Sequence, residues 1–353
     1  MSACAPTGAI ARPLAGSFRR ARAASLAVLL ACAGVAPAAA APSPAPPPRT
    51  AAPLDLAAID AALEGWRLRD ARQLLATANG SGGADVRYAQ ARLALTEYRH
   101  VQAVALAAEC ARSARTDAQR SRCAEVEAEA VGMEVALSDA DFSSLGLASR
   151  LQSLLQRATR LDPRNVRAQV LQARYRRMAP WLLGGSASQA EAGIDRAARL
   201  APALADEFRG IDAYDAKAYD RALPLLRRAA RARPDRAAAA FYLALAHEQR
   251  GELDAARTQL RDVVARYPDF LDASYRLAVL ELDVQPARAA QLLRRYIPLA
   301  GAAGSKRIAR SWRHLGRAEA LLGRREQAID AYRRTLRLKP DDDIAQAALE
   351  RLQ

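Results

Sequence analysis

Residues 311–341 read SWRHLGRAEALLGRREQAIDAYRRTLRLKPD, and their spacing is typical of two short antiparallel helices joined by a turn. The small residues Gly316 and Ala328 stand where such helices touch, because only small side chains let two backbones approach closely. Larger side chains fill the space beside that contact, namely Trp312, Leu315 and Tyr332. Gly323 falls in the turn, and Pro340 ends the second helix, since proline cannot continue one. The pattern predicts a repeating unit of about 34 residues.

Together, these seven positions resemble the tetratricopeptide repeat. The resemblance implies an all-α, right-handed α-solenoid of antiparallel helix pairs, in which the first helix of each pair lines a concave groove and each repeat contacts only its neighbours. Proteins of this family serve as scaffolds for many unrelated partners. The resemblance therefore implies non-enzymatic protein binding through the groove and leaves the identity of the partner open.

The same spacing recurs upstream. The windows 203–236 and 237–270 carry it and abut without a gap, 271–308 is a degenerate unit, and 309–342 is the final repeat, followed by a C-terminal capping helix. Residues 54–202 show a looser helical periodicity with the same repeat endings. No run alternates in the manner of a strand, so we expect about eight helical pairs and no sheet.

Residues 1–41 are expected to be a signal peptide rather than part of the fold. Several arginines precede an apolar run, and the small residues around Ala40 fit a cleavage site. A second interpretation is a lipoprotein signal that ends at residue 31, with a lipid on Cys32, because an LLAC motif ends there. Residues 42–53 are a Pro-rich tether. We therefore expect an exported, periplasmic protein that is either soluble or held at the membrane only by a lipid on Cys32.

Beyond that leader, the cysteines are Cys110 and Cys123. They lie about equally far from an expected helix–helix turn at Ser113–Asp117. An αα-hairpin would put them side by side, within reach of a disulfide in an oxidising compartment. The alternative is that both are small buried hydrophobic residues. Without a Cys-x-x-Cys motif they predict no metal site.

The sequence contains no catalytic constellation. Its three histidines, His100, His247 and His314, fall in different repeats, so no two of them should meet in a triad or a metal site. Carboxylates are dispersed, and the run at Asp341–Asp343 follows Pro340, where a helix start favours acidic side chains. We therefore expect no enzymatic activity, no metal and no cofactor.

Charge is divided unevenly along the chain. The net charge is −1 over residues 51–160 and +11 over residues 161–353. The candidates for groove-lining positions are Arg310, Arg313, Arg317, Tyr242 and Glu248. The three arginines are spaced by three and four residues and so share one helix face. Guanidinium groups in a groove suit a carboxylate, so we expect a protein partner with an acidic segment or a C-terminal carboxylate. The alternative is a solvated basic face.

A second basic group lies at the end of the 203–236 unit, at Arg227, Arg228, Arg231, Arg233 and Arg236. Second helices normally face the convex side, so we expect one dense patch that could meet anionic lipid headgroups, peptidoglycan or another acidic polymer. We do not expect nucleic acid as a partner. The leader predicts export, and no aromatic side chains are interleaved with these arginines to stack on bases.

One loop differs from the other turns. Residues 178–186 read MAPWLLGGS and lengthen the turn between two helices of the 164–202 unit. The Pro-x-x-x-Gly-Gly sequence resembles a loop of some exported bacterial repeat proteins, including helical-repeat lipoprotein partners of substrate-binding transport systems. The resemblance implies that Trp181 and Leu182 contact a ligand or partner. The alternative is that they fold back and cap an adjoining helix pair.

Two functions therefore remain open. One is a protein-interaction scaffold of the bacterial cell envelope, which an open groove would favour. The other is a transport-associated, ligand-binding lipoprotein, in which the N-terminal helices and the 178–186 loop enclose a small molecule. A closed, pore-like arrangement of helices would favour this second function.

Overall fold

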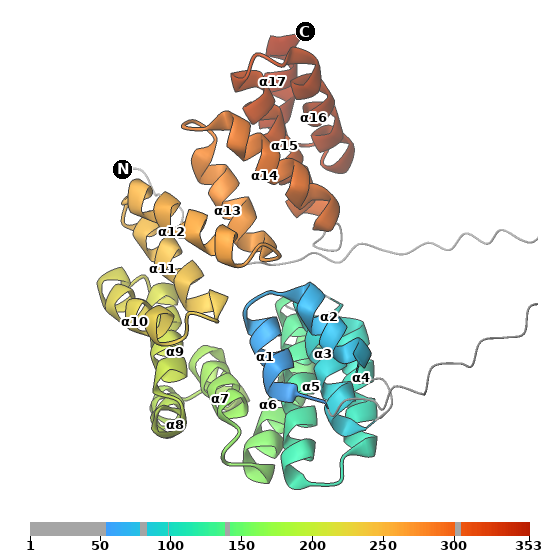
Figure 1. Ribbon diagram of the computed structural model, residues 1–353, viewed down its shortest axis with the longest axis vertical. Coiled ribbons are helices and arrows are strands. Elements are labelled where there is room, and N and C mark those ends of the chain that lie inside the picture. The colour runs from blue at the N-terminus through green and yellow to red at the C-terminus, as the bar shows by residue number, and fades with distance from the viewer. Residues whose placement is uncertain (1–53, 78–82, 98, 138–141, 301–304) are drawn as a thin grey trace, which may run out of the picture.

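The computed structural model describes residues 54–77, 83–97, 99–137, 142–300 and 305–353. Within these ranges all regular secondary structure is helical, with 17 α-helices, one 3₁₀ turn and no strand. The helices form eight consecutive antiparallel pairs and a single last helix (Figure 1). The predicted all-α solenoid of about eight pairs is confirmed. The leader, Cys32 and the Pro-rich tether lie outside the described residues.

The first four pairs occupy the N-terminal half of the chain. Their helices are α1 (Leu56–Glu64), α2 (Leu68–Thr77), α3 (Ala84–Thr96), α4 (His100–Ser113), α5 (Asp117–Leu137), α6 (Phe142–Leu161), α7 (Val166–Met178) and α8 (Ala187–Leu200). The 3₁₀ turn η1 (Trp181–Leu183) lies between α7 and α8.

The last four pairs contain the windows that repeat most regularly in the sequence. Their helices are α9 (Pro202–Asp215), α10 (Tyr219–Ala232), α11 (Ala237–Gln249), α12 (Leu253–Arg266), α13 (Leu271–Glu281), α14 (Pro286–Leu299), α15 (Ser305–Leu321) and α16 (Arg325–Leu338). Helix α17 (Asp343–Leu352) packs on α16 and closes the array. Odd-numbered helices of neighbouring pairs also contact each other in several places, for example α3 with α5 and α9 with α11.

Glycines let the two helices of a pair approach closely. A Cβ atom on Gly210 of α9 would lie 2.7 Å from the Leu226 side chain on α10. A Cβ atom on Gly316 of α15 would lie 2.9 Å from the Tyr332 ring on α16. The buried residues form separate clusters, each built mainly from neighbouring helices, rather than one central core. Such clusters are what a stack of short helix pairs buries, since no pair can cover its apolar face alone.

Adding one methyl group at Gly316 is expected to destabilise the fold. Gly316→Ala must displace the buried Tyr332 ring, and overpacking of this kind lowers the free energy of unfolding by about 1–3 kcal/mol. Gly146→Ala is the matched control, because nothing lies within 4 Å of a Cβ there and alanine favours a helix interior. Urea unfolding followed by circular dichroism measures both. Equal stability of the two variants would contradict the close contact.

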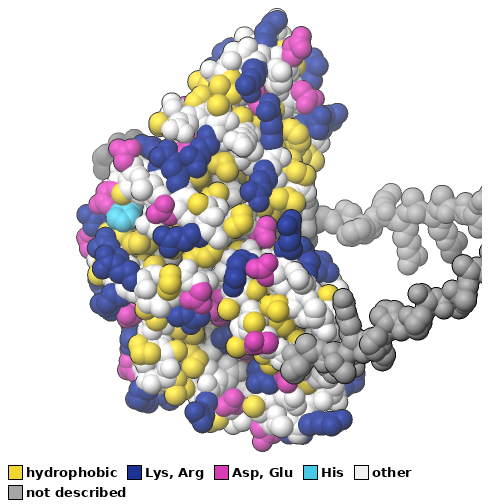
Figure 2. All heavy atoms as spheres, in the orientation of Figure 1, with side chains coloured by type: hydrophobic (Ala, Val, Ile, Leu, Met, Phe, Trp, Pro, Cys, Tyr) yellow, Lys and Arg dark blue, Asp and Glu magenta, His cyan; other side chains and the backbone are white. Residues whose placement is uncertain are grey.

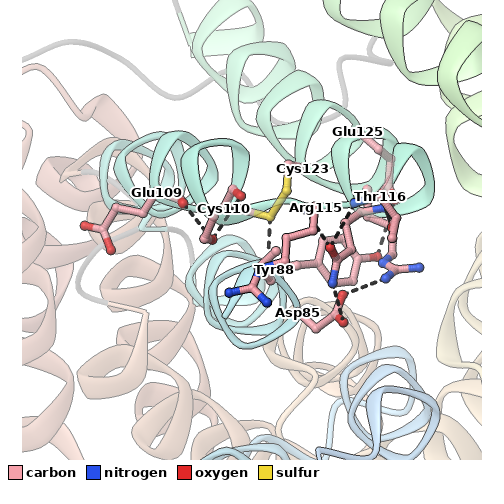
Figure 3. The surroundings of a disulfide bond; sticks show 12 residues. Asp85, Tyr88, Glu109, Cys110, Arg115, Thr116, Cys123 and Glu125 are labelled. Atoms are coloured by element: carbon pink, nitrogen blue, oxygen red, sulfur yellow. Dashed lines mark hydrogen bonds and ion pairs between the residues drawn. A yellow bond between two sulfur atoms is a disulfide. The ribbon is translucent and has the colours of Figure 1, made fainter. Parts of the chain in front are cut away.

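A disulfide joins Cys110 of α4 to Cys123 of α5, with their Cα atoms 5.5 Å apart (Figure 3). The turn between these helices is closed by Gln119, whose Oε1 accepts a hydrogen bond from the Arg115 N–H at 2.9 Å. Both cysteines are buried beside Tyr88 of α3. The bond therefore fixes the second pair to the third within one apolar cluster.

Thiol labelling tests this bond directly. Unfolded protein under non-reducing conditions should leave Cys110 and Cys123 unlabelled, whereas reduction should expose both. A cross-link that closes a loop of about 15 residues contributes about 3 kcal/mol, so the double variant Cys110→Ala/Cys123→Ala should lose stability of that order. Peptide mapping assigns the labelled positions. Free thiols at both positions before reduction would refute the disulfide.

Candidate functional site

The three arginines of the last complete repeat project from one side of α15. The opposite side of this helix is packed, with Leu315 buried and Gly316 against Tyr332. Arg310 is exposed, and among the described residues no carboxylate lies within ion-pair distance of it. This side chain can therefore offer its full charge to a ligand.

Arg313 and Arg317 are already paired within the chain. Arg313 donates two hydrogen bonds of 3.0 Å to the two oxygens of Asp342, which is almost fully buried. Asp342 also caps α17 by accepting from the Ala345 N–H at 3.1 Å. Arg317 lies 2.6 Å from Asp283, and both of these side chains are exposed. Arg313 therefore helps to hold α17 against the last pair. Of the three predicted arginines, Arg313 and Arg317 form ion pairs, whereas Arg310 forms none with the described residues.

His314 lies half-buried near the three arginines of α15. Burial, followed by the charges of Arg313, Arg310 and Arg317, lowers the pKa of His314 to about 4. Its ring lies 6.0 Å from the Tyr275 ring of α13. The imidazole is therefore neutral at neutral pH, and the surrounding arginines disfavour any further cation. The same potential favours an anion, the charge that a carboxylate carries.

Removing the charge of Arg310 is expected to raise the pKa of His314. A nearby cation disfavours imidazolium, so Arg310→Ala should move the titration above its present value of about 4. Arg333→Ala on the exposed side of α16 is the control and should leave it unchanged. NMR titration can follow this histidine, since the sequence has three. An unchanged titration in Arg310→Ala would contradict the electropositive surface.

The other two groove candidates lie on α11 and belong to a different contact. Tyr242 packs its ring against Tyr214 of α9, with centroids 5.4 Å apart, and burial raises its pKa. Glu248 pairs with Arg276 of α13. Tyr275 adjoins Arg276 in the sequence and faces His314, so α13 links the two groups of candidates. Within the described part of the chain, no hydrogen bond, ion pair or ring contact joins Tyr242 or Glu248 to the three arginines.

The loop at residues 178–186 presents Trp181 and Leu182 to solvent, with 79% and 72% of their surfaces exposed. The alternative in which they fold back over a helix pair is therefore wrong. The Tyr175 hydroxyl donates to the Leu183 carbonyl at 2.7 Å and holds the loop to α7. Gly185 is required, because a Cβ atom would lie 1.8 Å from the Ala179 carbonyl oxygen. The loop is therefore a turn that is hydrogen-bonded to α7 and exposes the apolar side chains of Trp181 and Leu182.

The predicted basic patch at the end of the fifth pair does not exist as one surface. Arg227 and Arg231 are exposed, and Arg228 pairs with Asp206 at 2.9 Å. Arg233 and Arg236 instead point toward Glu64 of the first pair. The expected patch of five arginines is wrong, because the last two follow the end of α10 and face the inner side. Figure 2 shows basic, acidic and apolar side chains mixed over one whole face.

A centre of charged residues that the sequence reasoning missed joins the first pair to the fourth and fifth. Glu64, at the end of α1, lies 2.6 Å from Arg236, 3.0 Å from Arg233 and 3.7 Å from Arg167 of α7. Arg167 also binds two carboxylates of α5, Glu125 at 2.9 Å and Glu129 at 2.7 Å. Arg236 donates to Glu207 of α9 at 2.8 Å. The inner side of the curve is filled here by paired charges.

Two further contacts extend this closure. The Trp66 ring stacks on the Phe270 ring, with centroids 4.5 Å apart and planes 12° apart. The Leu68 N–H donates to Asp269 at 3.2 Å. Figure 1 shows α1 and α2 on the inner side of the curve that α7 to α13 form. The expectation that each repeat touches only its neighbours is wrong, because the array curves until its first turn meets the fifth and sixth pairs.

Acid is expected to weaken this closure. Burial raises the pKa of Glu64, but Arg236, Arg167 and Arg92 together lower it more, so it lies below its ordinary value of 4.5. Since the pKa is lower in the folded state, the stabilisation is complete above the unfolded value and is lost as the pH falls through the folded value.

The free energy of unfolding, compared between the wild type and Glu64→Gln, measures this effect. The wild type should be the more stable at neutral pH, and the difference should shrink as the pH falls below 4.5. Protonated Glu64 resembles glutamine in charge, which is why the two proteins should converge. A difference independent of pH would show that the ionised carboxylate does not contribute.

Within the described residues, no three His, Cys, Asp or Glu side chains are grouped so that they could hold a metal ion. In the same part of the chain, no helix is both long and apolar enough to cross a bilayer.

The C-terminal repeats match a known family. The tetratricopeptide repeat model matches residues 209–269, 250–306 and 285–343, from within α9 to the start of α17. Over this part of the chain the molecule is a tetratricopeptide-repeat protein, as the sequence spacing indicated. Among curated proteins, none matches this sequence.

Several solved structures are similar in their helical arrangement. A chain of the Cut9–Hcn1 hetero-tetramer of the APC/C is 14% identical with a TM-score of 0.47, and the match covers 81% of this chain and 59% of that one. PilF of Pseudomonas aeruginosa is 19% identical with a TM-score of 0.46, over 60% of this chain and 92% of that one. PilW, described as a type IV pilus biogenesis factor, is 16% identical with a TM-score of 0.44, over 58% and 91%. At these values the likenesses carry no argument about function.

Proposed function

We propose that the protein is a non-enzymatic scaffold that binds a partner protein on the inner surface of its last repeats. The unpaired Arg310 on the electropositive side of α15 is the observation that carries this proposal. Its partner presents an acidic segment or a C-terminal carboxylate, which a guanidinium group binds with two parallel hydrogen bonds. Arg317 and Arg313, although each is paired with a carboxylate, add positive charge to the surface that meets the partner. Tyr242 and Glu248 line the neighbouring surface.

The proposed location is the bacterial cell envelope, with the protein exported to the periplasm. This part of the proposal is supported by the leader sequence alone, with its arginines and apolar run. Intact mass of the protein purified from its native cell tests it. A mass beginning near Ala41 supports a soluble periplasmic scaffold, and a mass that retains the leader contradicts export.

A transport-associated, ligand-binding lipoprotein is the second candidate, because the first pair closes the curve of helices against the fourth to sixth pairs. Such closure favours an enclosed ligand. The centre of the closed region, however, is filled by Arg167, Arg236 and their carboxylates. A lipid on Cys32 in the purified protein, together with a bound small molecule released on denaturation, would support this candidate over the scaffold.

Reversal of the Arg310 charge tests the scaffold. Cross-linking in native cells should capture a specific protein, and Arg310→Glu should weaken its binding to the purified scaffold by about tenfold or more, since a charge-assisted hydrogen bond contributes about 1.5–3 kcal/mol. Arg333→Glu changes the charge equally on the exposed side of α16 and is the matched control. Equal binding by the two variants would refute a role for the α15 surface.

A further inference from the structure

The turn between the two helices of a pair has the same form in four pairs. Three residues separate the helices, and the middle one adopts a left-handed backbone conformation. These middle residues are Gly251 with φ 79°, Gly323 with φ 72°, Lys217 with φ 61° and Trp66 with φ 51°. Glycine adopts this conformation freely, whereas a residue with a Cβ atom pays about 1–2 kcal/mol. Tryptophan therefore occupies the turn against local preference, which points to a role for its side chain.

The Trp66 side chain has one specific partner. Its ring lies flat on Phe270, at the turn between α12 and α13, and adjoins a cluster that includes Phe241 and Ala237 of α11. Stacked aromatic pairs contribute about 0.5–1.5 kcal/mol beyond the area that they bury. The stack therefore offsets the conformational free energy that the left-handed backbone of Trp66 costs.

The residues beside Trp66 also contact the turns after α10 and α12. Glu64 meets the guanidinium groups of Arg233 and Arg236, and the Leu68 N–H donates to Asp269. Gly65 lies so close to the next turn that a Cβ atom would be 2.9 Å from the Asp235 carbonyl oxygen. Each of these positions therefore touches the turn after α10 or the turn after α12. Four of the five residues 64–68 are thus held like a short peptide ligand, whereas Arg67 is exposed and pairs with Asp70 of its own helix pair.

The rest of the first pair is anchored elsewhere. Ile59, Leu63, Ala71 and Leu75 of α1 and α2 pack with Leu93 of α3 in a separate apolar cluster. Trp66 and Glu64 lie outside that cluster, whereas the Leu68 side chain packs against it. The turn can therefore leave the fifth and sixth pairs while the first pair stays folded on the second.

We propose that residues 64–68 are a built-in ligand, and that the surface that holds them binds an acidic–Gly–aromatic turn of a partner protein. The receptor residues are Arg167, Arg233, Arg236, Asp269 and Phe270. The partner's acidic side chain meets the three arginines, and its aromatic ring stacks on Phe270. This inference rests on the proposed scaffold function only in that the occupant is a protein segment. It uses none of the α15 residues, so either proposal can fail alone.

A glycine exchange opens the site without disturbing the backbone of the turn. Trp66→Gly keeps the left-handed conformation and removes the stack. Lys217→Gly makes the same exchange at the same position of the fifth pair and is the matched control. In the full-length protein, hydrogen exchange should accelerate at residues 64–68 and at Asp269 and Phe270 in Trp66→Gly, with the other helices unchanged. Lys217→Gly should exchange like the wild type at these segments.

The binding test uses a labelled peptide of residues 62–69, ALEGWRLR, and fluorescence anisotropy. Trp66→Gly should bind it at least about tenfold more tightly than the wild type or Lys217→Gly, because the intact turn competes from within the same molecule at high effective concentration. Peptides with Gln at the position of Glu64 or Ala at the position of Trp66 should bind about tenfold more weakly. The double variant Trp66→Gly/Arg236→Ala should bind the original peptide about tenfold more weakly than Trp66→Gly does.

Two results would overturn the proposal. Unchanged hydrogen exchange in Trp66→Gly would show that the stack does not hold the turn. Accelerated exchange without peptide binding would show that the surface is not a receptor. Arg310→Glu in the Trp66→Gly background should bind the peptide as tightly as Trp66→Gly alone. If the α15 surface failed to capture a partner, the peptide-binding result would still support the proposal for residues 64–68. If the peptide failed to bind, the proposed scaffold function of the α15 surface would be unaffected.

Discussion

The ionised carboxylate of Glu64, held among Arg167, Arg233 and Arg236, is the contact on which the shape of this protein depends. These groups come from three parts of the chain, and each is partly or largely removed from water. Removing one member of such a set leaves buried charges without a partner, which is far more costly than the net gain from forming the set. The network therefore specifies how far the helical array curves. An array with contacts only between neighbours would not fix that curvature.

This closure divides the inner surface into two regions. Around the first pair, the surface is covered by residues 64–68 and neutralised by paired charges. Around α15, burial and then the charges of Arg313, Arg310 and Arg317 depress the pKa of His314, and Arg310 has no carboxylate partner among the described residues. The two regions thus differ in what they can bind and in whether they must first be uncovered.

The sequence predicted what local spacing determines. Gly316 lies against Tyr332 because the repeat pattern encodes which positions of two sequential helices face each other. The same spacing placed Gly323 in the turn between two helices, where its φ is 72°. It could not reveal that Arg313 fastens Asp342 or that Trp66 meets Phe270. The Trp66–Phe270 contact depends on rotations between helices that add up over several pairs, and no short pattern encodes their sum. A tryptophan at a turn position where two of the other three turns have glycine was a local signal of the closure.

Pulsed electron paramagnetic resonance between spin labels at Arg69 and Arg266, both exposed, tests the closure most directly. The account predicts one short, narrow distance distribution at neutral pH. In Glu64→Gln, part of the population should move to longer distances, because the carboxylate holds the first pair to the fifth. A long or broad distribution in the wild type would mean that the array is open, and would contradict the account.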